Sequence, residues 1–391
     1  MTRKAVLIPA ALVFLLFSGS VFLFGEEETL DDLFDDPFLE DTVVEEDEEV
    51  DHRSQFETSD KILLRGSFSA TGAAEAGWRD FPWRSGITED FGLAPGAKAR
   101  ARISFDARPS SVLTIAGNIF TEIDPGDRKN DWTDPAVGEL YADYNWLDTA
   151  FIRAGKFGMR WGQGRLFSPG NLMDGSRDGT AFRASFPTLL DGVSIVALAN
   201  DDFAGEDGRL SGKDLAGAGI ADKVIGGVQL TAAARYQREE GLKALGSFKT
   251  VLWRIDLFSD FVFHDNDRDG RDFEVLAGFF REWEDFLLYG EYYYDNRTEG
   301  NMDHKIGLAA GYKDIFGSPF DFGIEWKHAF YDNSGRILPG IAWSPWRHIK
   351  AMAGVPVYYG GDKSRFVDEE DVFSGKRRLS LAFALELSTS F

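Results

Sequence analysis

The sequence predicts an all-β fold, a transmembrane antiparallel up-and-down β-barrel of about 16 strands, with 14 as the alternative count. Beyond its N-terminal region, the chain has no run of about 18 apolar residues that could form a transmembrane helix. From residue 60 onward, segments alternate apolar and polar residues with a period of two. Glycine and aromatic residues are abundant, with 42 Gly, 34 Phe, 11 Tyr and 10 Trp among 391 residues. Because only a closed sheet pairs every backbone polar group away from water, strands that cross a bilayer must form a barrel.

Residues 1–25 have the pattern of a secretory signal peptide. Arg3 and Lys4 precede an apolar run over residues 5–17, which a short Ser-Gly-Ser step and a second apolar stretch follow. We expect cleavage after Gly25, or alternatively after Ser20. The chain contains no cysteine, which excludes a lipoprotein anchor and structural disulfides.

Residues 26–59 form a separate acidic segment before the barrel, which we assign to residues 60–391. Residues 26–51 hold fifteen Asp or Glu and no Lys or Arg, a large share of the formal net charge of −23. Such a run repels itself and cannot bury a core, so we expect a disordered segment. Within it, residues 30–39 alternate acidic and apolar residues, which indicates either a short docking motif for a partner or a solvated tether.

Sixteen segments in the predicted barrel have strand periodicity. The eight upward strands are 61–76, 111–122, 150–160, 192–200, 247–263, 286–294, 319–330 and 349–359. The eight downward strands are 97–108, 137–146, 181–187, 223–236, 271–281, 304–313, 336–343 and 376–391. Short links join most downward strands to the next upward strand, and mostly longer polar loops join upward to downward strands, as bacterial barrels require. Three short loops on the long-loop side and a long link at 237–246 keep the count of fourteen open.

The alternation within each strand predicts which side chains face the lumen. Residues 97–108 place Arg and Lys on one face and Ala, Ile and Phe on the other. An Arg or Lys that faces lipid near the midplane costs roughly 2–4 kcal/mol, so the charged face must point inward. The predicted pore-lining residues are Lys98, Arg100, Arg102, Arg108, Glu139, Asp143, Asp321, Glu325 and Lys327.

Aromatic residues recur near the predicted strand ends. Trp146, Tyr236, Trp283, Trp343 and Trp346 fall at the short-turn end, and Trp161, Tyr292, Tyr294, Tyr331, Tyr358 and Tyr359 at the long-loop end. Two such bands are typical of the interfacial girdles of membrane barrels. The alternative is that they pack at the rim of a soluble barrel or sandwich.

The last strand carries a resemblance to a known signal. It alternates strictly from Leu379 to Leu387 and ends on Phe391. A terminal amphipathic strand of this kind resembles the membrane-insertion signal of bacterial outer-membrane β-barrels, with Leu387 and Phe391 as its signal residues. The resemblance implies outer-membrane lipid, the barrel-assembly machinery and periplasmic chaperones as partners. It also implies that both chain ends and the acidic segment lie in the periplasm.

A second resemblance covers residues 155–172, which read GKFGMRWGQGRLFSPGNL. This Trp-Gly-x-Gly segment, followed by Ser-Pro and Asn-Leu, resembles a motif of porin-like outer-membrane proteins, including those of spirochaetes. It opens the third outer loop, 161–180, whose position is similar to that of the constriction loop of sixteen-stranded general porins. We expect the loop to face the basic strand across a narrow eyelet, with an external surface loop as the alternative. Its candidate residues are Arg160, Arg165, Asp174, Arg177 and Asp178.

Other site classes find little support in the sequence. Asp265, Asp267 and Asp269 begin like a calcium loop, but position twelve is Leu276 rather than Glu, which leaves a weak divalent-cation site or a solvated hairpin. The five histidines are scattered, and no nucleophile motif exists, so we expect neither an enzyme nor a cofactor. The acidity of the chain disfavours nucleic-acid binding.

The sequence therefore favours a porin-like channel for passive diffusion of small hydrophilic solutes, with a tilt toward anions from the basic strand. One alternative is a transporter of hydrophobic solutes that resembles the fatty-acid channels, although the chain lacks their N-terminal Asn-Pro-Ala plug element. Another is a non-conducting structural or adhesive barrel. A homo-oligomer is compatible with each of these functions.

Overall fold

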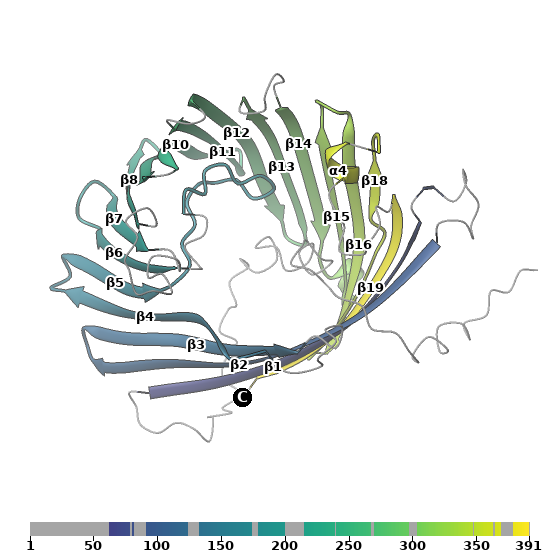
Figure 1. Ribbon diagram of the computed structural model, residues 1–391, viewed down its shortest axis with the longest axis horizontal. Coiled ribbons are helices and arrows are strands. Elements are labelled where there is room, and N and C mark those ends of the chain that lie inside the picture. Colours follow the sequence, from purple (N-terminus) through teal and green to yellow (C-terminus); the bar gives the residue numbers. More distant parts are fainter. Residues whose placement is uncertain are drawn as a thin grey trace, which may run out of the picture.

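A computed structural model describes most of the chain from residue 62 onward. The described residues are 62–78, 80–81, 91–123, 133–173, 179–199, 215–238, 240–266, 270–296, 303–346, 348–362, 364–368 and 378–390. They form one antiparallel sheet that closes on itself, because β1 pairs with both β2 and β19 (Figure 1). The predicted all-β barrel is confirmed.

Consecutive strands are neighbours around the whole ring. The first nine are β1 (Ile62–Trp78), β2 (Phe91–Ser110), β3 (Leu113–Ile123), β4 (Ala136–Trp146), β5 (Ala150–Lys156), β6 (Thr180–Phe186), β7 (Gly192–Ala199), β8 (Leu215–Ile225) and β9 (Val228–Gln237). The others are β10 (Gly241–Leu252), β11 (Ile255–Asn266), β12 (Gly270–Trp283), β13 (Phe286–Asp295), β14 (Asp303–Tyr312), β15 (Phe320–Ala329), β16 (Ser334–Trp346), β17 (Ile349–Gly354), β18 (Val357–Tyr359) and β19 (Leu379–Ser390). A 3-10 turn, η3 (Ile315–Gly317), and a short helix, α4 (Arg365–Asp368), complete the described elements.

The barrel has eighteen spans, so the predicted count of sixteen, and its alternative of fourteen, were wrong. The described residues form nineteen strands, but β17 and β18 both lie between β16 and β19 and together form one interrupted span. Pro356 lies at the interruption and has no N–H to donate to the ladder.

The two missing spans come from two hairpins, each of which the sequence analysis predicts as one long strand. The predicted strand 223–236 contains the turn between β8 and β9, where Gly226 and Gly227 have φ of 58° and 83°. The predicted strand 247–263 contains the turn between β10 and β11, where Trp253 and Arg254 have φ of 54° and 63°. Positive φ at both central residues is the geometry of the tight hairpin turns that match strand twist.

The short turns gather at one end of the barrel and the longer connections at the other. Ile62 pairs with Ala107, near the short β2–β3 turn, and Ser390 pairs with Ser67, so both described chain ends lie at the short-turn end. The segment 237–246, predicted as a long periplasmic link, instead joins β9 to β10 at the long-loop end. Tyr236 therefore belongs to the long-loop end and not to the short-turn girdle.

Strand register separates an outer and an inner face. Large apolar side chains are exposed on the outer face, among them Ile103, Ile119, Ile195, Phe261 and Phe383. The register places the side chains of neighbouring strands on the same face, so that Ile103 and Ile119 stand opposite each other. No helix in the described part of the chain is long and apolar enough to cross a membrane.

An apolar cluster lies inside the ring. It joins inner-face residues of β6 to β11 to side chains of the segment that follows β5. Its buried members are Phe157, Trp161, Leu172, Met173, Ala181, Val196, Leu198, Ala216, Ala233, Leu245 and Val262. Trp161 is therefore a core residue rather than a member of the outer aromatic band, because its loop turns inward.

Candidate functional site: the inner loop and the charged wall

The segment after β5 enters the barrel. We call residues 157–173 the inner loop, and Figure 1 shows it within the ring of strands, next to β10 to β13. Two carboxylates on the inner face of the wall accept its backbone N–H groups. Asp260 on β11 accepts hydrogen bonds from Gln163 (2.7 Å) and Gly164 (3.3 Å). The loop is thus part of the barrel interior and not the external surface loop that was the alternative.

Glu291 on β13 is the second anchor and is only 2% exposed. Its Oε1 accepts a hydrogen bond from the N–H of Arg165 at 2.6 Å, and its Oε2 accepts one from Phe167 at 2.7 Å. The hydroxyl of Tyr289, on the same strand and face, donates a third hydrogen bond to this carboxylate. The two backbone donors attach the loop to the wall, while Tyr289 gives the buried carboxylate a further partner within the wall, and such charge-assisted bonds are the strong ones.

The glycines of the Trp-Gly-x-Gly motif allow this close approach. Gly162 has φ +87°, and a Cβ on it would lie 2.7 Å from the backbone of Gly170 and 2.9 Å from Oδ2 of Asp260. A Cβ on Gly170 would lie 2.6 Å from the same oxygen. Larger residues would push the loop away from its anchor, so the motif encodes a backbone that lies against a buried carboxylate.

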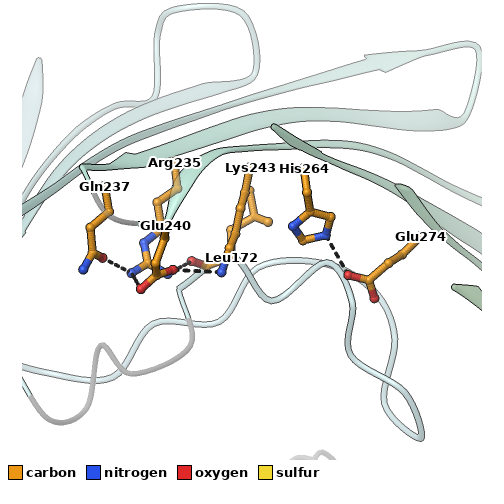
Figure 2. Close-up of polar contacts among 7 residues, drawn as sticks. All are labelled: Leu172, Arg235, Gln237, Glu240, Lys243, His264 and Glu274. Carbon is orange, nitrogen blue, oxygen red and sulfur yellow. Dashed lines mark hydrogen bonds and ion pairs between the residues drawn. The ribbon is translucent and has the colours of Figure 1, made fainter. Parts of the chain in front are cut away.

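Apolar contacts complete the attachment. Leu166 packs with Phe258, Leu276 and Tyr289 in a second buried cluster, and the ring of Phe167 stacks on Tyr293 with centroids 5.5 Å apart. Near the end of the loop, the carbonyl of Leu172 accepts a hydrogen bond of 3.1 Å from Nη1 of Arg235 (Figure 2). Contacts with the wall therefore fix both the first and the second half of the inner loop.

The inner face of β9 to β16, which we call the charged wall, carries buried ion pairs and hydrogen bonds. Besides Asp260 and Glu291, its buried charged groups include Glu274, Asp303, Lys305, Glu325, Lys327 and Arg336. His264 Nε2 lies 2.7 Å from Glu274 Oε1, and Lys305 Nζ lies 3.0 Å from Asp303 Oδ2. Glu325 is bonded by Arg336 at 3.0 Å and lies 3.5 Å from Lys327. Buried charges are tolerated when they are paired in this way.

A short helical segment of the loop before β19 meets the charged wall. Arg365 of α4 pairs with Asp303 through its side chain, and its backbone N–H donates a hydrogen bond of 2.5 Å to Asp332. Burial alone raises the pKa of Asp332, but hydrogen bonds from Ser334 and from the Arg365 backbone outweigh it and hold the pKa below its ordinary value. Phe366 and Val367 are buried beside these polar contacts.

The structure places the predicted basic residues of β2 on the inner face, away from the contacts of the inner loop. Lys98 and Arg100 pair with Glu122 on β3, whereas Arg102 is exposed. The side chain of Lys98 is 51% exposed and that of Arg100 is 42% exposed, in contrast to 11% for Lys305 on the charged wall. We call Lys98, Arg100 and Arg102 the basic face. Arg108 pairs with Asp106 nearer the short-turn end.

The other predicted pore-lining residues fall into several local groups. Asp143 forms a two-fold hydrogen bond of 2.7 Å with Arg153, and Glu139 accepts a long hydrogen bond of 3.4 Å from Gly158 at the start of the inner loop. Asp321 accepts a hydrogen bond from Asp314 beside η3, whereas Glu325 and Lys327 belong to the charged wall. That these residues line a conducting pore stays a prediction.

Among the predicted loop residues, Arg160 donates hydrogen bonds to the carbonyl of Gly164 and to Ser168, so its described contacts lie within the loop. The guanidinium of Arg165 lies 5.6 Å from the ring centre of Phe280. Asp174, Arg177 and Asp178 lie outside the described residues. The eyelet between these groups and the basic face stays a prediction.

Two further predicted sites are only partly described. Asp265 lies on β11 beside Arg271 at 3.4 Å, while Asp267 and Asp269 lie outside the described residues, and the described part of the chain holds no group of three potential metal ligands. Leu387 is exposed on the outer face of β19, whereas Phe391 lies outside the described residues.

Sequence reasoning missed Asp260, Glu291, Arg235, Arg153 and Arg336. Their strands alternate strongly enough to assign them to the inner face, so the alternation alone could have found them as lumen residues. Their partners could not have been found in that way, because the loop atoms that Asp260 and Glu291 bind lie 97 and 126 residues away along the chain.

Comparisons with known proteins agree with the architecture. No protein-family model matches the sequence, and no curated protein matches it. Among solved structures, OccAB3 of Acinetobacter baumannii matches at a TM-score of 0.53 and 7% identity, covering 84% of this chain and 99% of that one. OpdK of Pseudomonas aeruginosa, solved with vanillate, matches at 0.53 and 8%, covering 84% and 99%. A BenF-like porin of Pseudomonas fluorescens Pf-5 matches at 0.51 and 9%, also covering 84% and 99%. At these identities the likeness establishes that this chain has the fold of outer-membrane porins.

Proposed function

We propose that this protein is a porin-like channel of the bacterial outer membrane that lets small hydrophilic solutes diffuse passively. The observation that carries the proposal is the closed barrel with an apolar outer face and an inner face divided between two regions. The inner loop lies against part of the charged wall, whereas the basic face of β2 stays exposed inside the ring. A charged, hydrated surface of this kind lets solutes pass without full loss of their water.

The exposed basic face favours anionic solutes as the better permeants. Lys98 and Arg100 share one acidic partner, Glu122, and Arg102 adds a further positive charge. OpdK, a barrel of the same fold, was solved with vanillate, which is an aromatic carboxylate. A small organic anion is therefore a reasonable first solute for this chain. The motif at Trp161 to Leu172 supports a relationship with spirochaete-type outer-membrane proteins.

The proposal includes the parts of the chain that precede the barrel. A signal peptide at 1–25 would direct export, and the acidic segment 26–59 would lie in the periplasm with both chain ends. Insertion would depend on the barrel-assembly machinery and periplasmic chaperones through Leu387 and Phe391, and a homo-oligomer is compatible with this function. We expect no enzymatic activity.

Single-channel recording from the refolded protein in planar bilayers tests the proposal. The expected result is discrete open steps whose size rises with KCl concentration. A folded, heat-modifiable barrel that produces no steps would contradict it and would favour the plugged transporter of hydrophobic solutes or the structural barrel.

A further inference from the structure

A pocket of about 360 Å³ lies between the inner loop and the charged wall. The wall contributes one side chain from each of five consecutive strands, β10 to β14, in the order Lys243, His264, Glu274, Tyr293 and Lys305. The loop contributes its turn from Phe167 to Leu172. At roughly 30 Å³ per water molecule, this volume equals about a dozen waters, which is enough for a single sugar ring together with several waters. It falls in the range of small-ligand sites.

The charges around the pocket are balanced. Each lysine already has an acidic partner, since Lys243 Nζ lies 2.9 Å from Glu240 and Lys305 Nζ lies 3.0 Å from Asp303. Each of these acids has a second basic partner, which is Arg235 for Glu240 and Arg365 for Asp303. Counted together, four basic groups, which are the two lysines, Arg235 and Arg365, stand against four acidic ones, which are Glu240, Glu274, Asp303 and the buried Asp295 that accepts a hydrogen bond of 3.0 Å from Tyr293. A ligand with a net charge would therefore have to compete with existing partners.

The polar groups are mixed in kind. Ammonium and amide groups donate hydrogen bonds, whereas the Glu274 carboxylate, which His264 and Tyr293 contact at 2.7 Å and 2.5 Å, accepts them. Ser168 and Asn171 on the loop side can do both. A carboxylate ligand can only accept, and it would face Glu274 with like charge. A hydroxyl group donates and accepts at once, so it can match every position of this lining.

The pocket also has an apolar part. Phe167, Pro169 and Leu172 of the loop line it together with Tyr293 of the wall, and the rings of Phe167 and Tyr293 stack on each other at 5.5 Å. A sugar ring presents apolar C–H groups on its faces and hydroxyl groups on its edge, and this distribution matches a lining that is apolar in one part and polar in the other. Figure 2 shows Lys243, His264 and Glu274 one after another along the wall, with their side chains toward the inner loop.

From this lining we infer that the pocket between residues 167–172 and strands β10 to β14 is a binding site for a neutral, hydroxyl-rich solute of about one sugar ring. The inference rests on the proposed function, because such a solute would enter the pocket from the lumen of the channel. The two inner regions then treat solutes differently. The basic face attracts anions from solution, whereas the pocket retains neutral solutes through hydrogen bonds.

The test compares glucose with glucuronate, which keeps the sugar ring and carries a carboxylate in place of the CH₂OH group, as blockers of single-channel current. Lys243→Met removes one donor of the pocket, and Glu240 keeps Arg235 as its partner. Lys249→Met is the matched control on the same strand and face, about 20 Å nearer the short-turn end at 3.3 Å per residue. Lys305→Met is the second variant if Lys243→Met does not fold, because Asp303 keeps Arg365.

We expect glucose to block at a lower concentration than glucuronate, and Lys243→Met to raise the blocking concentration of glucose roughly tenfold or more, while Lys249→Met leaves it unchanged. A stronger block by glucuronate, or an equal block by glucose in the Lys243→Met and Lys249→Met variants, would overturn the inference, while the open steps themselves would still support the channel. Calorimetric titration of glucose into the detergent-folded barrel needs no conduction. Binding that is lost in Lys243→Met, in a protein that never conducts, would uphold the pocket and overturn the channel.

Discussion

The anchoring of the inner loop by Glu291 gives the sharpest prediction about the interior of the barrel. In Glu291→Gln one carboxylate oxygen is replaced by an NH₂ group. The remaining oxygen can accept a hydrogen bond from the N–H of Arg165 or from that of Phe167, but the NH₂ group cannot accept the other one. One charge-assisted bond is lost and one buried N–H is left without its partner. At about 1.5–3 kcal/mol for a hydrogen bond to a charged group, the attached state of the loop should lose about 2–3 kcal/mol. This corresponds to roughly a 30- to 150-fold rise in the detached population, at 1.4 kcal/mol per tenfold.

A single reporter cysteine can measure this population, because the chain has no cysteine of its own. Leu166 lies between the two anchored residues and is 7% exposed, so Leu166→Cys should react with a thiol reagent only when the loop detaches. The labelling rate is compared in three backgrounds: the reporter alone, with Glu291→Gln, and with Asp256→Asn. Asp256 is the control, since it lies on β11 and pairs with Lys249 away from the loop. Equal labelling rates in the two carboxylate variants would refute the anchoring role of Glu291.

Three further predictions concern the barrel itself. Gly227→Val should destabilise the barrel by about 1–2 kcal/mol, because position 227 has φ +83°. Gly219→Ala should be neutral, because a Cβ there would meet its nearest atom at 3.7 Å. Urea unfolding in lipid measures the stability of both variants, and equal midpoints would contradict the positive φ at this turn. Ile103→Arg should cost roughly 2–4 kcal/mol in the same assay and Arg102→Ile much less, and the reverse order would mean that the faces are exchanged. The pKa of Asp332 is lowered in the folded protein, so its contribution to stability is present above the unfolded pKa and is lost as pH falls through the folded pKa. Acidification should therefore lower the protection factors of the Ser334 and Arg365 amides, which are the ratios of the intrinsic to the observed hydrogen-exchange rates, and the Asp332→Asn variant should not show this fall. An equal fall in both proteins would contradict the prediction.

The alternation of single strands was sufficient to predict the barrel class and the inner face of several strands. In β2 the positive residues fall on every second position, and the register places them opposite Ser67 and Ser69 on β1 and away from the apolar outer face. Lipid on one side and water on the other impose this pattern locally, so it can be read without knowing the partners of the strand.

The number of spans could not be obtained in the same way, because it depends on single turns. Gly226-Gly227 is a recognised hairpin signal, and a closer reading could have found it. Trp253 and Arg254 carry no such signal, although both adopt positive φ. At this turn the closure of the barrel and the pairing of β10 with β11 outweigh the preference of the two residues for other conformations.

The position of the inner loop was also beyond the sequence. Its glycines indicate close backbone packing, but they do not say against what. The answer is Asp260 and Glu291, which are near the loop only after β11 and β13 have taken their places in the ring. Contacts between groups so distant along the chain depend on the strand count and register of the whole barrel.

The reversal potential of single channels in a KCl gradient tests the central claim most directly, because it reports whether ions pass along the basic face. The account predicts an anion preference in the unaltered protein, and a loss or reversal of that preference in the double variant Arg100→Glu and Arg102→Glu. Both side chains face the interior and are exposed there, so their charges should act on every passing ion. A reversal potential that is the same in the two proteins would contradict the claim that this face lines the conducting path.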